Sequence, residues 1–169
     1  MTISLHVRLG DKVEEHRTQG VASTFSNSIQ IVSSLKGLLG GARKVRLVVV
    51  TDSSPEELAS FLRSEQIDVE LDGAGGALFG PVDAEIVSGG NPLVAIHCLA
   101  SADVVFTNEK CRDGNNIQCS FFLKFAHMLS LGIVFPVTHV TLSQDAIEGQ
   151  ARTLRDGLAT RVATSRSRP

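Results

Sequence analysis

The stretch KVRLVVVTDSSPEELASFLR, residues 44–63, decides the fold class. Its first part, from Lys44 to Thr51, is rich in β-branched residues and apolar on both faces, which is typical of an interior strand in a parallel sheet. Ser54-Pro55-Glu56-Glu57 then supplies an N-cap serine, a proline at the first helical position and an acid three residues after the cap. A buried strand that leads directly into a capped helix is the unit from which α/β folds are built.

The rest of the chain repeats this alternation of strand and helix. Strands are predicted at Ile3–Leu9, Ile67–Leu71, Asp103–Thr107 and Ile133–Val137, and helices over Phe25–Leu39, Asn91–Leu99, Ser120–Leu131 and from Ser143. Asp72–Pro81 is glycine-rich and is predicted to be a mobile surface loop. The pattern predicts an α/β, Rossmann-like three-layer sandwich with a mostly parallel sheet. We expect one domain over residues 1–160 and a disordered Ser/Arg-rich tail over residues 161–169.

The composition limits the classes of function that the chain can have. The 169 residues are 43% hydrophobic, enough for a core that needs neither disulfides nor a metal. A formal net charge of -2 disfavours a nucleic-acid partner, so any recognition of phosphate must be local. The three cysteines lack the paired spacing of a zinc site, so no metal is expected; Cys111 and Cys119 remain candidates for a pair across a loop.

Targeting signals are not evident in the sequence. The first residues lack the basic and then apolar pattern of a signal peptide, and no apolar run approaches the ~20 residues of a membrane span. We therefore expect a cytoplasmic location if the protein is bacterial. A fragment of a eukaryotic enzyme would instead come from the Golgi or secretory lumen.

The first predicted strand carries two candidate ligand-binding side chains on the same face. Alternation places His6 and Arg8 together, and Gly10 allows the chain to turn sharply after them. A planar, permanently charged guanidinium at a strand end suits a bidentate contact with phosphate. The alternative is structural, with Arg8 paired to Asp11 and His6 hydrogen-bonded in the core.

Two further candidates follow later strands. Asp52 lies between the interior strand and its capped helix, where a carboxylate can accept hydrogen bonds from a ribose or a base. Ser120 opens a helix, and the exposed N–H groups there can bind an anion. Each also has a plain structural explanation, since acids and serines stabilise helix N-termini without any ligand.

Three motifs resemble those of the α1,2-, α1,6- and protein O-fucosyltransferases. His6–Lys12 is similar to their H-x-R-x-G/T-D motif, and Thr51–Ser53 is similar to Thr/Ser-Asp-Asp, with Ser53 in place of the second acid. Ile96–Asp103 followed by Cys119–Phe122 resembles the third motif, with a polar insertion between them. The three occur in the family's order over about residues 3 to 135.

The resemblance implies the C-terminal half of a GT-B glycosyltransferase. This half binds GDP-fucose, and the transfer inverts the anomeric centre without a metal or other cofactor. By matched position, Arg8 would hold the diphosphate as the catalytic group and His6 would lie near the nucleotide. Asp52 would contact the guanosine, and Ser120 with the Phe121 backbone would bind phosphate. The acceptor would be a glycan or a protein, and a second domain or chain would complete the cleft.

Two other functions remain open at this stage. One is a catalytically inactive Rossmann-like fragment that serves as a nucleotide-binding or protein-interaction module. The other is a phosphate-signalling, receiver-like domain, because Asp11 and Asp52 both follow strands. That second alternative lacks a clear acidic pair and a lysine after the strand Ile133–Val137.

Overall fold

The computed structural model describes residues 1–9, 20–40, 44–88, 91–108, 128–129 and 132–166. Within these residues a seven-stranded sheet has the order β3-β4-β5-β2-β1-β6-β7. Its strands are β1 (Thr2–Val7), β2 (Arg46–Thr51), β3 (Glu70–Leu71), β4 (Gly76–Phe79), β5 (Val82–Ser88), β6 (Val104–Asn108) and β7 (Ile133–Val137). The helices are α2 (Val21–Leu39), α3 (Pro55–Ser64), α4 (Pro92–Ala100) and α6 (Gln144–Arg166).

Five neighbouring strands, β5, β2, β1, β6 and β7, are parallel. If these five parallel strands are numbered by their order in the chain, their order across the sheet is 3-2-1-4-5. This is the strand order of Rossmann-like folds. The predicted α/β class with a mostly parallel sheet is confirmed. Receiver domains have the order 2-1-3-4-5 instead, so the receiver-like alternative is wrong.

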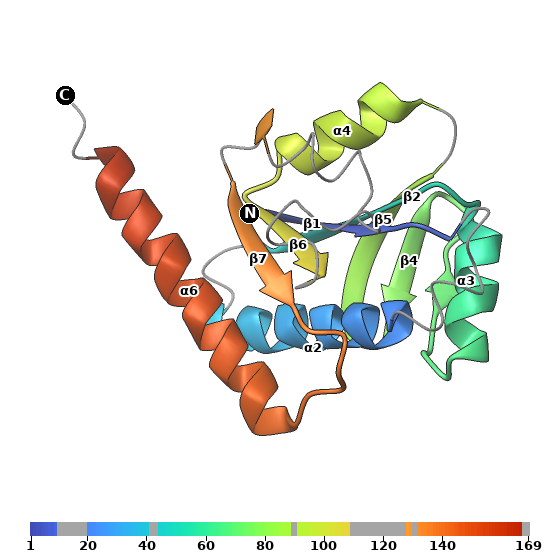
Figure 1. The fold of residues 1–169 in the computed structure, drawn as a ribbon, viewed down its shortest axis with the longest axis horizontal. Coiled ribbons are helices and arrows are strands. Elements are labelled where there is room, and N and C mark those ends of the chain that lie inside the picture. Colours follow the sequence, from blue (N-terminus) through green and yellow to red (C-terminus); the bar gives the residue numbers. More distant parts are fainter. Residues whose placement is uncertain (10–19, 41–43, 89–90, 109–127, 130–131, 167–169) are drawn as a thin grey trace.

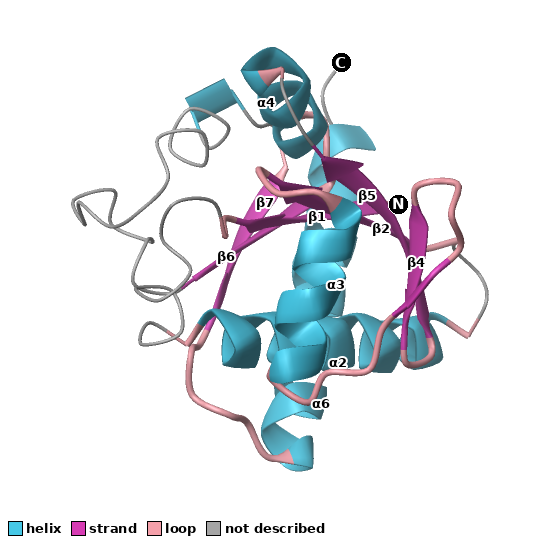
Figure 2. Ribbon diagram, turned by 90° about the vertical axis from the view of Figure 1, so that its right-hand side faces the viewer, coloured by secondary structure: helices cyan, strands magenta, loops and turns pink. Residues whose placement is uncertain are grey.

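Helices cover both faces of the sheet, which gives three layers (Figures 1 and 2). On one face α2, α3 and α6 pack against alternate residues of β1 and β2 in the larger core. On the other face α4 packs against Val48, Val50 and Val105 through Leu99 in a smaller cluster. Because β2 is buried on both faces, its sequence shows no polar alternation.

Local signals in the sequence correspond to the observed helix ends. Ser54 Oγ accepts a hydrogen bond from Glu57 N at 3.1 Å, and the Glu57 carboxylate accepts one from Ser54 N at 2.9 Å, which completes the predicted capping box. Helix α2 ends at Gly40 in the left-handed conformation, with φ of 55°. The helix predicted after Ser54 and the predicted end of the helix at Leu39 are confirmed.

The predicted loop over Asp72–Pro81 is wrong in part. It contains β4, which pairs antiparallel with both β3 and β5. Asp72 Oδ1 accepts hydrogen bonds from Ala74 N and Gly76 N, each at 2.8 Å, and so closes the turn that starts β4. Gly73 and Gly75 belong to this hairpin turn, Gly80 belongs to the next one, and Phe79 anchors β4 in the core with 1% exposure.

The C-terminal helix also differs from the prediction. Its stripe of Ile147, Ala151, Leu154 and Leu158 is buried as the spacing indicates. The helix then continues to Arg166, through residues that we expected to be disordered. A helix that is already nucleated by packing adds further turns at little cost, so a Ser/Arg-rich sequence can follow as helix.

Candidate functional site

The candidate site lies at the carboxyl ends of the parallel strands. In β1, Ile3, Leu5 and Val7 enter the larger core, so the alternate residues face α4. Ser4 confirms this direction, because its Oγ donates a hydrogen bond to the carbonyl oxygen of Cys98 in α4 at 3.1 Å. His6 follows on the same face, as the alternation predicts.

Arg8 and Asp52 meet where β1 and β2 end. The two strands stay in register as far as Val7 and Thr51, so the next residues of both lie at the same edge. Nε of Arg8 lies 3.6 Å from Oδ2 of Asp52. Oδ1 of Asp52 accepts a hydrogen bond from the backbone N–H of Leu9 at 2.8 Å. The structure thus brings the predicted site residues Arg8 and Asp52 together. It also shows that Asp52 holds the end of β1 through its hydrogen bond with Leu9 N.

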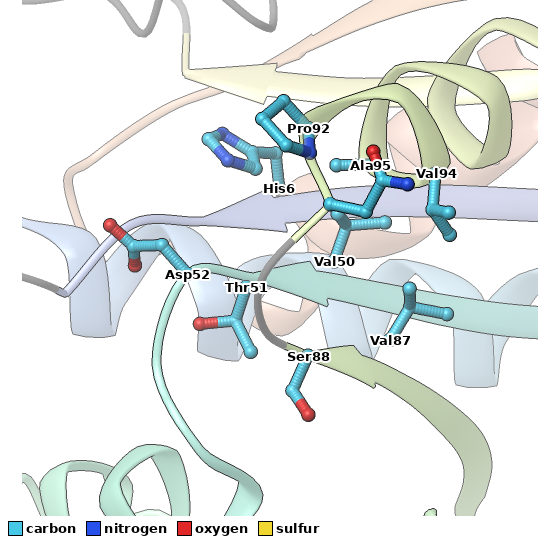
Figure 3. A pocket seen from close by; sticks show the side chains of 10 residues that line it. His6, Val50, Thr51, Asp52, Val87, Ser88, Pro92, Val94 and Ala95 are labelled. Atoms are coloured by element: carbon cyan, nitrogen blue, oxygen red, sulfur yellow. The ribbon is translucent and has the colours of Figure 1, made fainter.

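A hollow of about 210 Å³ opens beside this pair. Its polar walls come from His6, Thr51, Asp52, Ser88 and Asn91, and its apolar walls from Val50, Val87, Pro92, Val94 and Ala95. Figure 3 shows the side chains of β1, β2 and β5 on one side and the start of α4 on the other. Strand ends and a helix start therefore share one concave site, the usual place for a ligand in such sheets.

The first turn of α4 borders the hollow with its backbone N–H groups partly satisfied. Asn91 caps the helix, since its Oδ1 accepts a hydrogen bond from Leu93 N at 3.0 Å, and Pro92 occupies the first helical position. The helix itself was predicted from Asn91-Pro92, but its role as a wall of the site was not. Ser88 and Val87 were missed for a different reason, because residues 82–88 received no prediction as a strand.

The third predicted element cannot be placed. Ser120 and Phe121 lie outside the described residues, as do Asp11, Cys111 and Cys119. Strand β6, which precedes Ser120 in sequence, runs parallel to β1 and ends at Asn108. Asn108 Nδ2 donates a hydrogen bond to Thr24 Oγ1 of α2 at 3.2 Å, which ties this strand end to the helix that follows β1.

One titratable group near α4 departs from its ordinary pKa. Burial raises the pKa of the Cys98 thiol above 9.0, Glu85 adds to the rise, and Arg46 opposes it. Arg46 and Glu85 form an ion pair at the start of β2, at the opposite end of that strand from the hollow. Cys98 therefore belongs to the packing of α4 on the sheet and not to the candidate site.

Searches for relatives identify no family for the chain. No known protein-family model matches it, and no curated protein matches it. Within the described residues, no group of three His, Cys, Asp or Glu side chains could hold a metal ion. The helices of the described ranges include none with the length and apolar character to cross a membrane. Fold and site together define a Rossmann-like α/β domain with a hollow at its strand ends.

Proposed function

We propose that the chain is the donor-binding domain of a glycosyltransferase that takes GDP-fucose. The observation that carries this proposal is the meeting of Arg8 with Asp52 beside a hollow lined by His6. These residues come from two of the three motifs that resemble fucosyltransferases, and they are far apart in sequence. A guanidinium beside a partly apolar hollow offers complementary surfaces to a diphosphate and a nucleoside.

The size of the hollow suggests how the donor is divided between subsites. Pockets that enclose a whole drug-sized ligand measure about 300–1,000 Å³, so 210 Å³ suits one part of a nucleotide sugar. We assign the nucleoside to the hollow, against His6 and the apolar walls from β5 and α4. The diphosphate then lies over Arg8, and the sugar points out of the hollow to an acceptor.

Transfer would use Arg8 to stabilise the leaving group. Departure of GDP develops negative charge on the β-phosphate, and a guanidinium already held in place stabilises that charge more than the ground state. Inversion at the sugar and a base for the acceptor hydroxyl require a second half, supplied by another domain or chain. The acceptor is a glycan or a protein.

Calorimetric titration with GDP, UDP and orthophosphate tests donor binding. We expect GDP to bind, and we expect Arg8→Ala to lower its affinity at least tenfold, about 1.4 kcal/mol. Arg152→Ala is the matched control, because that arginine is 51% exposed on α6 and pairs with Glu148. Lack of GDP binding at millimolar concentration by folded protein would contradict the proposal.

The second candidate is a catalytically inactive module that keeps the fold. It is favoured by the fact that Asp52 and Arg8 already pair with each other, as a purely structural ion pair would. An inactive module that serves in protein interaction predicts that Arg8→Ala leaves nucleotide affinity unchanged and changes only the stability of the protein. The same titrations therefore separate the two candidates.

A further inference from the structure

Two contacts of Asp52 within the described residues lie on the side of Arg8. Its two carboxylate oxygens point to different partners, Oδ1 to Leu9 N at 2.8 Å and Oδ2 to Arg8 Nε at 3.6 Å. We propose that Asp52 is a positioning residue that holds Arg8 for the diphosphate, and that it does not recognise the base. This inference rests on the proposed donor-binding function and revises the role that the resemblance implied for Asp52.

The contact with Leu9 fixes the backbone next to Arg8. Register pairing between β1 and β2 ends at Val7, so the N–H of Leu9 lies beyond the strand ladder. Leu9 is only 2% exposed, and a buried N–H without an acceptor is costly. Oδ1 of Asp52 supplies that acceptor from the end of β2. The Cα position of Arg8, one residue earlier, is fixed by the same bond.

The second oxygen acts on the guanidinium by charge. A separation of 3.6 Å is too long for a good hydrogen bond but keeps the two charges adjacent. Both side chains are more than a third exposed, at 39% and 37%, so water screens the attraction and the pair adds little to stability. The pair instead orients Arg8. Because Asp52 attracts Nε, the planar guanidinium can point in fewer directions, and its Nη atoms are held where they would contact phosphate.

The position of the carboxylate disfavours contact with a base in the hollow. In Figure 3 the Asp52 carboxylate is directed away from Val87, Val94 and Ala95, which form the apolar walls. Asp52 itself lines the hollow, but to reach a base packed on those apolar walls its Oδ1 would have to turn from Leu9 N. That rotation would break the hydrogen bond that holds the end of β1.

A comparison of GDP with guanosine distinguishes positioning of Arg8 from recognition of the base. Asp52→Asn keeps an oxygen for Leu9 N but removes the charge, so GDP affinity should fall about fivefold while guanosine affinity stays within about twofold. Asp52→Ala removes both contacts and should lower GDP affinity further. Asp68→Asn is the matched control, an exposed aspartate after α3 and away from the hollow, and it should change neither affinity.

A double-mutant cycle completes the binding test. In the Arg8→Ala background, Asp52→Asn should no longer lower GDP affinity, because the residue through which it acts is gone. Equal losses for guanosine and GDP would overturn the inference in favour of base recognition. Additive losses in the cycle would overturn it as well.

An NMR readout without nucleotide keeps the inference separate from the proposed function. The Arg8 Nε–H signal should shift and exchange faster with solvent in Asp52→Asn, whereas the Leu9 amide signal should remain and be displaced only in Asp52→Ala. If GDP fails to bind the wild-type protein, the donor function falls, and this spectrum still decides whether Asp52 holds Arg8. An unchanged Arg8 signal would overturn the positioning role.

Discussion

Gly20 is a residue whose lack of a side chain is required. It caps α2 with φ of 72°, and a Cβ there would lie 2.8 Å from the carbonyl oxygen of His139. Gly20→Ala should lower the free energy of unfolding by roughly 3 kcal/mol, from the left-handed backbone and the backbone clash together. Gly37→Ala in the same helix should stabilise by roughly 0.5–1 kcal/mol, since nothing lies within 4 Å of the added methyl. Urea unfolding measures both, and equal effects would contradict the assignment.

Cys98 makes stability depend on pH in the alkaline range. Its folded-state pKa is raised above 9.0, chiefly by burial, so folding favours the protonated thiol. This contribution is present below the unfolded pKa and is lost as pH rises through the folded pKa. The wild-type protein should therefore lose stability above pH 9.0 faster than Cys98→Ser, in which the thiol is absent. Unfolding midpoints over a pH series measure the difference, and parallel curves would contradict it.

Single residues of the site were predictable where they follow a strong pattern. His6 and Arg8 follow from alternation in β1, and Asp52 follows from its place after an interior strand. Their contacts were not predictable, because the bond from Leu9 N to Asp52 depends on two strands that are adjacent only in the fold. The sequence also suggested Asp11 as a partner for Arg8; Asp11 lies outside the described residues, and within them Arg8 contacts Asp52.

At the scale of elements, α2 holds the connection from β7 to α6 through one buried side chain. Asn27 is 1% exposed; its Nδ2 donates to the carbonyl oxygens of Thr138 and Val140, and its Oδ1 accepts from Leu142 N. Asn27→Ala should cost roughly 3 kcal/mol, about 1 kcal/mol for each lost bond. Thermal unfolding tests this expectation.

The control for Asn27 comes from the same helix. Gln30 is exposed and donates a hydrogen bond to the adjacent turn, to Ser26 Oγ at 3.2 Å. Gln30→Ala should therefore change stability by less than about 0.5 kcal/mol. A loss in Asn27→Ala no larger than that in Gln30→Ala would show that the connection is held by other contacts.

Most elements with a clear local pattern were predicted, whereas strands β4 and β5 were not. Helix α2 was predictable from Phe25, Ile29, Val32 and Leu35, all of which are buried. Strand β4 has only four residues, and what fixes it is a long-range contact, the edge-to-face packing of Phe79 on Phe25 with ring centroids 5.0 Å apart. A local pattern cannot show such a contact. The glycines around the strand therefore suggested a loop.

At the scale of the whole molecule, the sequence predicted the layers but not the strand order. Alternating strands and helices require parallel pairing and helices on the faces, but several orders satisfy that requirement. The observed order places β1 between β2 and β6, so the ends of β1 and β2 can share one hollow with β5. The residues that line the hollow depend on which strands and helices are neighbours, and for that reason Val94 and Ala95 of α4 were not predicted as site residues.

If the hollow holds the nucleoside, filling it should separate nucleoside binding from phosphate binding. Ala95 lines the hollow from α4, and Ala95→Phe should lower the affinity for guanosine and GDP at least tenfold, about 1.4 kcal/mol. Pyrophosphate, which needs Arg8 but not the hollow, should keep its affinity within about twofold. Leu93→Phe is the matched control, because Leu93 is 73% exposed on the same helix and does not line the hollow. Calorimetry on all three ligands, with circular dichroism to confirm folding, measures these effects. Retained GDP binding in Ala95→Phe would mean that the nucleoside lies elsewhere along the strand ends, and the division of the donor between hollow and arginine would then be wrong.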